Sequence, residues 1–215
     1  MAGDRDNRDD AVVSPARQLD IFERLLAIQD TSLAAGLTRA ADLVASALGA
    51  DKTDALLLDR ASDTLVAVGT SRTPMGRRQH GIGMDRLPLA NGGREVEVFL
   101  TGSPFLTGHA DEDPGQLLGF TQGLGIRSSA VVPLDVAGER RGVLIASSAR
   151  PDLFTEDDLR LLAAVSRWVG IVAHRAELLE RAAAEAREQG RRQAADELIA
   201  VLAHDLRNRI VPFKT

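Results

Sequence analysis

Five consecutive residues near the C-terminal end of the chain could carry chemistry, His204-Asp205-Leu206-Arg207-Asn208. A histidine side chain has an ordinary pKa near ~6.5, so His204 offers a neutral, nucleophilic ring nitrogen that could attack the γ-phosphate of a nucleotide. Asp205 could hold the proton on the other ring nitrogen and act as the base during that attack. Asn208 lies about one helical turn further on, where its amide could orient a water for the reverse hydrolysis. This spacing predicts a histidine that accepts a phosphoryl group.

The residues before this pentapeptide extend the pattern. The segment 198–208 reads Leu-Ile-Ala-Val-Leu-Ala-His-Asp-Leu-Arg-Asn and resembles the phosphoacceptor box of sensor histidine kinases. The resemblance implies that His204 is the phosphoacceptor and that residues 197–215 begin a dimerisation and phosphoacceptor helix, truncated here. The family usually has a proline five residues after the histidine, but this sequence has Arg209 there and Pro212 three residues later. The helix bend that proline causes is therefore expected to be shifted or weaker.

The same resemblance sets expectations for partners and cofactors. A histidine kinase needs ATP and Mg²⁺ on a separate catalytic domain, and no nucleotide-binding box occurs before Thr215. We therefore expect a fragment of a larger enzyme that holds no cofactor and is inactive alone. The expected partners are a second copy through the terminal helices, an ATP-binding kinase domain and a response regulator. The residues alone allow an alternative to a phosphoacceptor helix, namely an ordinary amphipathic helix that carries one exposed histidine. Leu202 and Leu206 mark the apolar face of this helix, and His204 points away from it.

The composition restricts the class of protein. With 215 residues, 44% apolar and 27% charged, the chain is typical of a soluble globular protein, and its net charge of −5 argues against nucleic-acid binding. No stretch approaches eighteen consecutive apolar residues and residues 1–10 do not form a signal peptide, so we expect a cytoplasmic protein without a membrane span. Cysteine is absent, which excludes disulfides, thiolate metal sites and thiol nucleophiles. Paired metal ligands at useful spacing are also missing.

The elements that must position these residues follow from hydrophobic periodicity. Residues 1–14 are charged and aperiodic and are predicted to be a disordered leader. Apolar residues at helical spacing predict helices over 15–29, 32–48 and 114–122, the second capped by Ser32 and ended by Gly49. Alternating or β-branched runs predict strands over 55–58, 64–68, 95–100, 129–136 and 141–148. Residues 70–93 are predicted to be a long loop that can include one short strand. Because the strands come mostly as hairpins, an antiparallel sheet with helices on one face is favoured.

A long terminal helix follows the last strand. Thr155 and Asp158 form a capping pattern at its start, and no proline occurs from there to Pro212. If residues 155–213 are helical throughout, they span on the order of 85 Å, longer than a globular domain. Its first part is expected to pack on the sheet. Residues 175–196 are predicted to be a helical linker, either a weak coiled coil or a solitary solvated helix. The coiled-coil seam would consist of Val172, Leu179, Ala186 and Gln193.

Three segments of the body, residues 123–134, 142–146 and 154–159, resemble a GAF domain. The resemblance covers about residues 18–175, and residues 15–174 are the sensor domain in this interpretation. It implies an α+β fold with a six-stranded antiparallel sheet and flanking helices, followed by the long C-terminal coiled-coil signalling helix. It further implies a small-molecule pocket on one face of the sheet. The combined interpretation is the sensory and phosphoacceptor part of a two-component histidine kinase.

The ligand of this sensor domain stays open at the level of sequence. The cysteine thioether that attaches bilin in related domains is impossible here, and the Asn-Lys part of the cyclic-nucleotide signature is missing. A loop histidine could supply one axial nitrogen to haem, with His109 the better candidate and His80 the other, although solvated loop histidines explain both. The basic segment 72–78 could attract an anionic ligand or be a solvated loop. A haem-based gas sensor and a non-catalytic ligand-binding or dimerisation module are therefore the alternative functions.

Overall fold

The structure is a computed structural model that describes residues 15–28 and 32–210, with side chains described over 18–28 and 32–204. The chain divides into two compact units, Met1–His174 and Arg175–Thr215, and each is described by itself. The predicted leader over residues 1–14 lies outside the described residues. Among the described helices, none combines the length and apolarity needed to cross a membrane.

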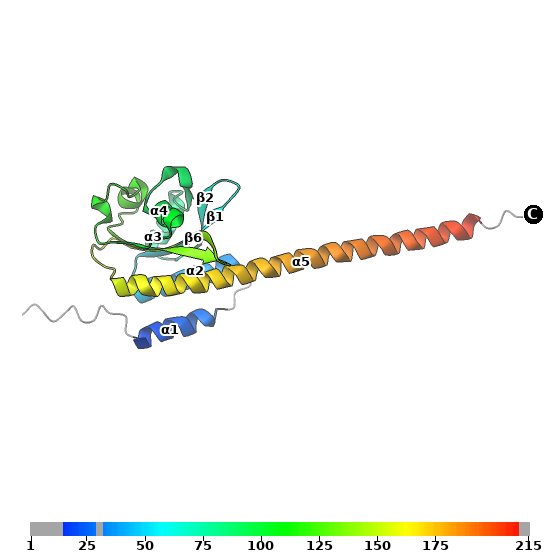
Figure 1. Ribbon diagram of the computed structural model, residues 1–215, viewed down its shortest axis with the longest axis horizontal. Coiled ribbons are helices and arrows are strands. Elements are labelled where there is room, and N and C mark those ends of the chain that lie inside the picture. The colour runs from blue at the N-terminus through cyan, green and yellow to red at the C-terminus, as the bar shows by residue number, and fades with distance from the viewer. Residues whose placement is uncertain (1–14, 29–31, 211–215) are drawn as a thin grey trace, which may run out of the picture. The chain divides into compact units, whose positions relative to one another are not determined.

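The first unit is built on one antiparallel sheet of six strands, in the order β3-β2-β1-β6-β5-β4 (Figure 1). Its strands are β1 (Lys52–Asp59), β2 (Thr64–Thr70), β3 (Arg86–Pro88), β4 (Phe105–Thr107), β5 (Ser128–Val136) and β6 (Glu139–Ser148). This confirms the predicted six-stranded antiparallel sheet. The β5–β6 hairpin is confirmed as well, with a turn of two residues, Ala137 and Gly138, that both have positive φ, as tight hairpin turns require.

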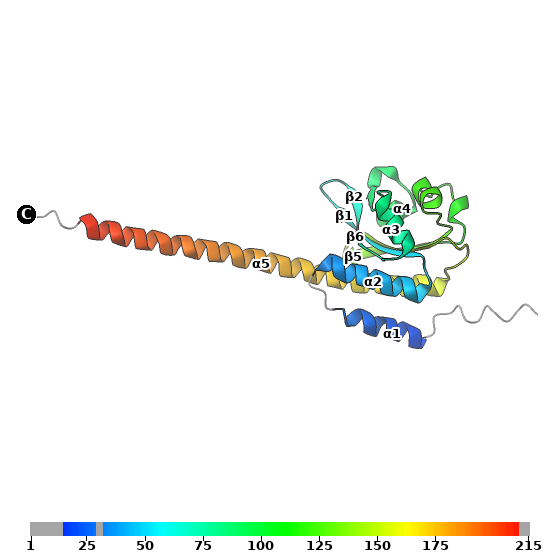
Figure 2. The same cartoon turned by 180° about the vertical axis from the view of Figure 1, so that it is seen from behind.

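Helices cover both faces of the sheet, so the expectation of helices on one face was wrong (Figures 1 and 2). The longer helices are α1 (Pro15–Leu26), α2 (Leu33–Leu48), α3 (Pro74–Gly81), α4 (Arg94–Thr101) and α5 (Glu156–Ile210). Three short turns of helix join them, η2 (Leu89–Asn91), η3 (Ala110–Glu112) and η4 (Gly119–Gly123). The predicted helix over 114–122 is thus reduced to η4.

One face carries an apolar core made by α1, α2 and the first part of α5, which we call the first layer. The predicted ends of α2 are confirmed, because Ser32 Oγ accepts a hydrogen bond from the Ala35 N–H (3.2 Å) and Gly49 has a left-handed φ of 61°. The helix α5 comes so close to β5 that no side chain fits at Gly170, where a Cβ would collide with the carbonyl oxygen of Asp135. The first layer is therefore packed without room for a ligand at this contact.

The opposite face is covered by α3, α4 and the short helical turns, and we call this the second layer. Two predictions fail here. The predicted strand over 95–100 is the helix α4, and the predicted loop over 70–93 contains the helices α3 and η2 besides the one short strand that it allowed, β3. In α4, the buried residues are Glu95, Val96, Val98 and Phe99, which follow helical spacing. In a run of only eight residues, however, this pattern is hard to distinguish from the alternation of a strand.

The helix α5 is continuous over 55 residues, as predicted. Its capping box is confirmed, since the Asp158 N–H donates to Thr155 Oγ1 (3.3 Å) and the Thr155 N–H donates to Asp158 Oδ2 (2.8 Å). Residues up to His174 belong to the sheet unit, with Leu162, Val165 and Val169 buried in the first layer.

Two glycines of α5 form a matched pair for testing the first-layer contact. Gly170→Ala is expected to destabilise the sheet unit by about 1–3 kcal/mol, because the new methyl group meets backbone that cannot move cheaply. Gly190→Ala, whose Cβ would meet nothing within 4 Å, should leave that unit unchanged. Urea unfolding followed by fluorescence of Trp168, the single tryptophan, measures both variants. Equal stability of the two variants would contradict the described contact.

Candidate functional site

A buried polar cluster lies inside the second layer. Side chains alternate along β1, so Lys52 and Asp54 face the same side as Leu56, which belongs to the second-layer core. Lys52 is fully buried, with 0% of its surface exposed. Its ammonium donates hydrogen bonds to Asp54 Oδ2 and to Gln79 Oε1 on α3. It also lies 5.2 Å from the centroid of the Phe120 ring on η4. One cation thus binds groups from three elements.

A second buried acid lies in the same layer. Glu95 on α4 accepts one hydrogen bond at Oε1, from the side-chain amide of Gln116 (3.2 Å), while its Oε2 has no partner among the described residues. Asp54 Oδ1 is likewise without one. Burial raises the pKa of Glu95, the positive charge of Lys52 opposes that rise, and the negative charge of Asp54 adds to it. The layer therefore holds two acids and one ammonium where a purely structural core would be apolar.

The polar character continues across one end of the sheet. The strand register pairs Lys52 with Ser147, Ser147 with Ser129, and Ser129 with Thr107. Directly paired residues of antiparallel strands present their side chains on the same face, so these four form a row across β1, β6, β5 and β4. Ser147 and Ser129 lie two residues from Ile145 and Val131 of the second-layer core, Thr107 lies two from Phe105, which packs against that core, and Lys52 lies four from Leu56. The row is therefore on the second-layer face.

The loop that covers this layer is held to α4 by an ion pair. The Arg94 guanidinium donates to both carboxylate oxygens of Asp113, with Nε to Oδ2 at 2.7 Å and Nη2 to Oδ1 at 2.8 Å. These hydrogen bonds keep the pKa of Asp113 below its usual value and raise the pKa of Arg94. The Arg94 guanidinium also lies 5.1 Å from the centroid of the Phe105 ring. The loop that carries Asp113 is thus held over the second layer by a bidentate ion pair with Arg94.

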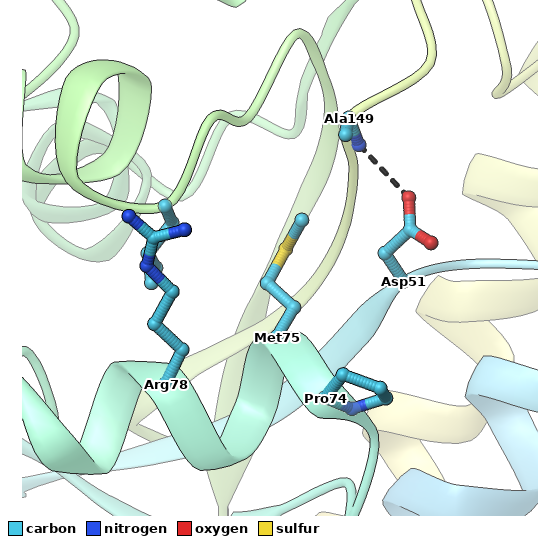
Figure 3. Close-up of a pocket in the computed structure, with 6 residues that line it drawn as sticks. Asp51, Pro74, Met75, Arg78 and Ala149 are labelled. Carbon is cyan, nitrogen blue, oxygen red and sulfur yellow. Dashed lines mark hydrogen bonds between the residues drawn. The ribbon is translucent and has the colours of Figure 1, made fainter.

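A cavity of about 290 Å³ opens beside the polar cluster (Figure 3). Its lining consists of Asp51, Pro74, Met75, Arg78, Leu124 and Ala149. Two of these residues directly precede members of the cluster, namely Asp51 before Lys52 and Arg78 before Gln79. The helix α3 therefore both lines the cavity and carries a member of the cluster, and the residue before β1 lines the cavity as well. A larger cavity of about 540 Å³ lies between β2 and α3, with Gln79 and His80 among its lining residues.

Neither of the histidines that the sequence singled out in the body belongs to the buried cluster. His109 is 47% exposed, and its Nε2 lies 3.3 Å from Asp152 Oδ2 while its Nδ1 lies 3.8 Å from Glu112 Oε1. It lines neither of the two cavities, so they give no support to the predicted haem ligation. His80 Nδ1 lies 3.1 Å from Asp85 Oδ2 at the rim of the larger cavity.

The predicted phosphoacceptor lies on α5 in the second unit, where the His204 side chain is exposed. Asp205 and Asn208 are within the helix, but their side chains lie outside the described residues. The turn before His204 carries apolar side chains that are each more than half exposed in the single chain. They are Leu198, Ile199, Val201 and Leu202.

Sequence reasoning missed the buried cluster. The strand prediction began at residue 55, although Lys52, Asp54 and Leu56 already alternate on one face. The sequence signal that could have revealed the cluster was the placement of charged residues, Lys52 and Asp54, on the core-facing positions of the strand. Its partners Gln79 and Glu95 are distant in sequence, so no local pattern connects them to Lys52.

Comparison with known proteins identifies the fold. A family model described as GAF domain matches residues 32–173. The free methionine-R-sulfoxide reductase of Neisseria meningitidis, solved in complex with its substrate, is similar with a TM-score of 0.65 and 22% identity over 83% of this chain and 98% of that chain. The GAF domain of an Acinetobacter phosphoenolpyruvate-protein phosphotransferase gives a TM-score of 0.62 and 20% identity over 76% and 97%. The phycocyanobilin-bound GAF domain of a cyanobacterial phytochrome gives 0.59 and 15% over 75% and 96%. No curated protein sequence matches the chain.

Removal of the central cation tests the cluster. Lys52→Met is expected to cost about 3–5 kcal/mol of unfolding free energy, because it leaves Asp54 and Glu95 buried without a cation. The double variant Lys52→Met/Asp54→Leu should lose much less, since both partners of the pair become apolar. Urea unfolding of the single and double variants gives the coupling free energy, and additive losses would contradict a buried ion pair.

Titration of Glu95 gives a further prediction. Because burial raises its pKa in the folded state, the unfolding free energy of the wild type should fall as pH rises from 4.5, the usual value for glutamate, through the raised pKa. Glu95→Gln should remove this loss, so that the variant is more stable than the wild type at neutral pH and not at pH below 4.5. Urea midpoints across this pH range measure the difference. Glu97→Gln, on the exposed side of the same helix, is the control and should keep the wild-type pH dependence.

Proposed function

Because the chain belongs to the GAF-domain family, we propose that it is the sensory and phosphoacceptor part of a two-component sensor histidine kinase. In this proposal, ligand binding in the sheet unit sets whether His204 accepts a phosphoryl group from ATP. The phosphoryl group then passes to a response regulator. The kinase activity belongs to a larger protein that supplies the ATP-binding domain with its Mg²⁺.

The observation that carries the proposal is the continuity of α5. One uninterrupted helix begins with a capping box at the sheet unit and extends through His204 to Ile210. Its first turns are fixed by burial in the first layer, and its later part holds the segment that resembles a phosphoacceptor box. A continuous helix can carry a change of twist or position along its length, because each turn is hydrogen-bonded to the next.

Exposed apolar side chains on the second unit support assembly into a homodimer. Leu178 and Leu179 are at least half exposed, as are the four apolar residues that precede His204. A helix in water gains stability chiefly by burying an apolar stripe. A second copy of the same helix could bury these side chains in a coiled coil. Within the dimer, we propose that Asp205 acts as the base for His204 and that Asn208 orients the hydrolytic water.

The solved neighbours support small-molecule binding in the sheet unit. The phytochrome domain is bound to phycocyanobilin and the reductase to its substrate. Neither thiol-dependent reduction nor thioether attachment of a chromophore is available to this chain, because the sequence has no cysteine. We therefore propose that the second layer binds its ligand reversibly and without covalent chemistry.

Phosphorylation in trans tests the proposal. The chain is incubated with a purified histidine-kinase ATP-binding domain, Mg²⁺ and γ-labelled ATP, and label is expected on His204 in an acid-labile form. His204→Ala should abolish labelling. His174→Ala, on the same helix but in the sheet unit, should leave it unchanged. Persistent labelling of His204→Ala would remove the assignment. A wild type that stays unlabelled would instead favour a non-catalytic ligand-binding or dimerisation module.

A further inference from the structure

The Arg78 side chain lines the cavity of about 290 Å³ and is exposed there. Within the described part of the chain, its guanidinium has no hydrogen-bond or ion-pair partner. The neighbouring arginines differ in this respect, since Arg72 pairs with Asp42 (2.7 Å) and Arg77 Nη1 donates to the Arg72 carbonyl (2.5 Å). Arg78 is therefore a cation that α3 presents to the cavity with its donors unused.

Most of the remaining lining is apolar. Met75 stands one helical turn before Arg78, and in Figure 3 its side chain projects between those of Arg78 and Asp51. Leu124 is buried in the second-layer core, and Met75 packs against that core. The cavity thus joins an apolar floor to a single available cation. A thioether is soft and flexible, so Met75 can adapt to ligands of different shape.

Asp51 is the acidic residue of the lining, and one of its carboxylate oxygens is already engaged in the structure of the wall. Its Oδ2 accepts hydrogen bonds from Ser148 Oγ (2.6 Å) and from the Ala149 N–H (2.9 Å), the second of which is drawn in Figure 3. These bonds tie the start of β1 to the end of β6. Asp51 therefore holds the wall opposite Arg78 and is not needed to bind the ligand.

We propose that this cavity binds a small organic carboxylate, with the carboxylate on Arg78 and the apolar body against Met75 and Leu124. A planar guanidinium matches the two oxygens of a carboxylate in a bidentate contact, and the apolar floor favours a hydrocarbon body over a second charge. The cavity volume suits a molecule of about benzoate size. The inference deepens the proposed sensory function, on which it rests, by naming the chemical class of the signal.

Methionine-methyl NMR of the whole chain tests the inference without any phosphorylation. The sequence has three methionines, Met1, Met75 and Met84, so the Met75 methyl signal is readily assigned with Met75→Leu. Titration with sodium benzoate is expected to shift this signal and to saturate. Benzamide, which has the same shape without the charge, should bind at least about tenfold more weakly, because charge-assisted hydrogen bonds are lost.

Two arginine variants separate a local contact from a general effect of charge. Arg78→Gln should weaken benzoate binding at least about tenfold and leave benzamide binding unchanged. Arg77→Gln removes the same charge from the residue directly before Arg78. Arg77 lines the other cavity, so this variant should bind benzoate like the wild type.

The inference is overturned if benzoate does not saturate the Met75 shift by about 10 mM, if benzamide binds equally well, or if Arg78→Gln retains wild-type affinity. Because His204 takes no part in this titration, failure here leaves the phosphoacceptor proposal standing, and failure of labelling leaves the binding result intact.

Discussion

The buried ammonium of Lys52 is the interaction on which the second layer depends. A charge inside a protein is tolerated only when hydrogen bonds and opposite charge replace its water, and Asp54, Gln79 and the Phe120 ring together meet that need. Those three groups come from β1, α3 and η4. The position of one side chain therefore determines where a helix and a loop can lie over the sheet. The cavities beside α3 follow from the same arrangement, because their lining residues are neighbours of the cluster.

The two faces of the sheet differ in the way they are stabilised. The first layer is apolar throughout its core, and its helices approach the strands closely enough to require glycine at position 170. The second layer combines an apolar cluster with two buried acids, Asp54 and Glu95, each of which has one carboxylate oxygen without a partner among the described side chains and backbone. Dense packing resists deformation, whereas a layer held by a few directional contacts can rearrange around a small molecule. This division is consistent with a GAF domain whose first layer includes the start of α5 and whose second layer is the ligand-binding side that we propose.

The terminal helix combines two environments in one element. As far as His174 it is part of a packed unit, and from Arg175 it is described as a separate one. The capping box fixes its start, and helical propensity sustains the Ala-, Glu- and Arg-rich stretch between residues 175 and 193. After Leu178 and Leu179, large apolar residues return only near His204. A stretch with few large apolar residues can stay helical without being buried, which suits the link between the sheet unit and His204 that we propose.

The sequence by itself determined the features that depend on local interactions. The cap at Thr155, the β5–β6 hairpin, the ends of α2 and the continuity of α5 all arise between residues a few positions apart, so a linear pattern contains them. The GAF segments were also visible as short runs of residues, and the resemblance of residues 198–208 to a phosphoacceptor box stays a prediction. Only the tertiary structure decided that residues 94–101 form a helix and that Lys52 is buried. For a run of eight residues, alternation and helical spacing predict similar faces, and burial by the rest of the fold selects one of them. The partners of Lys52 lie up to 68 residues away in the sequence, and only the folded chain brings them together.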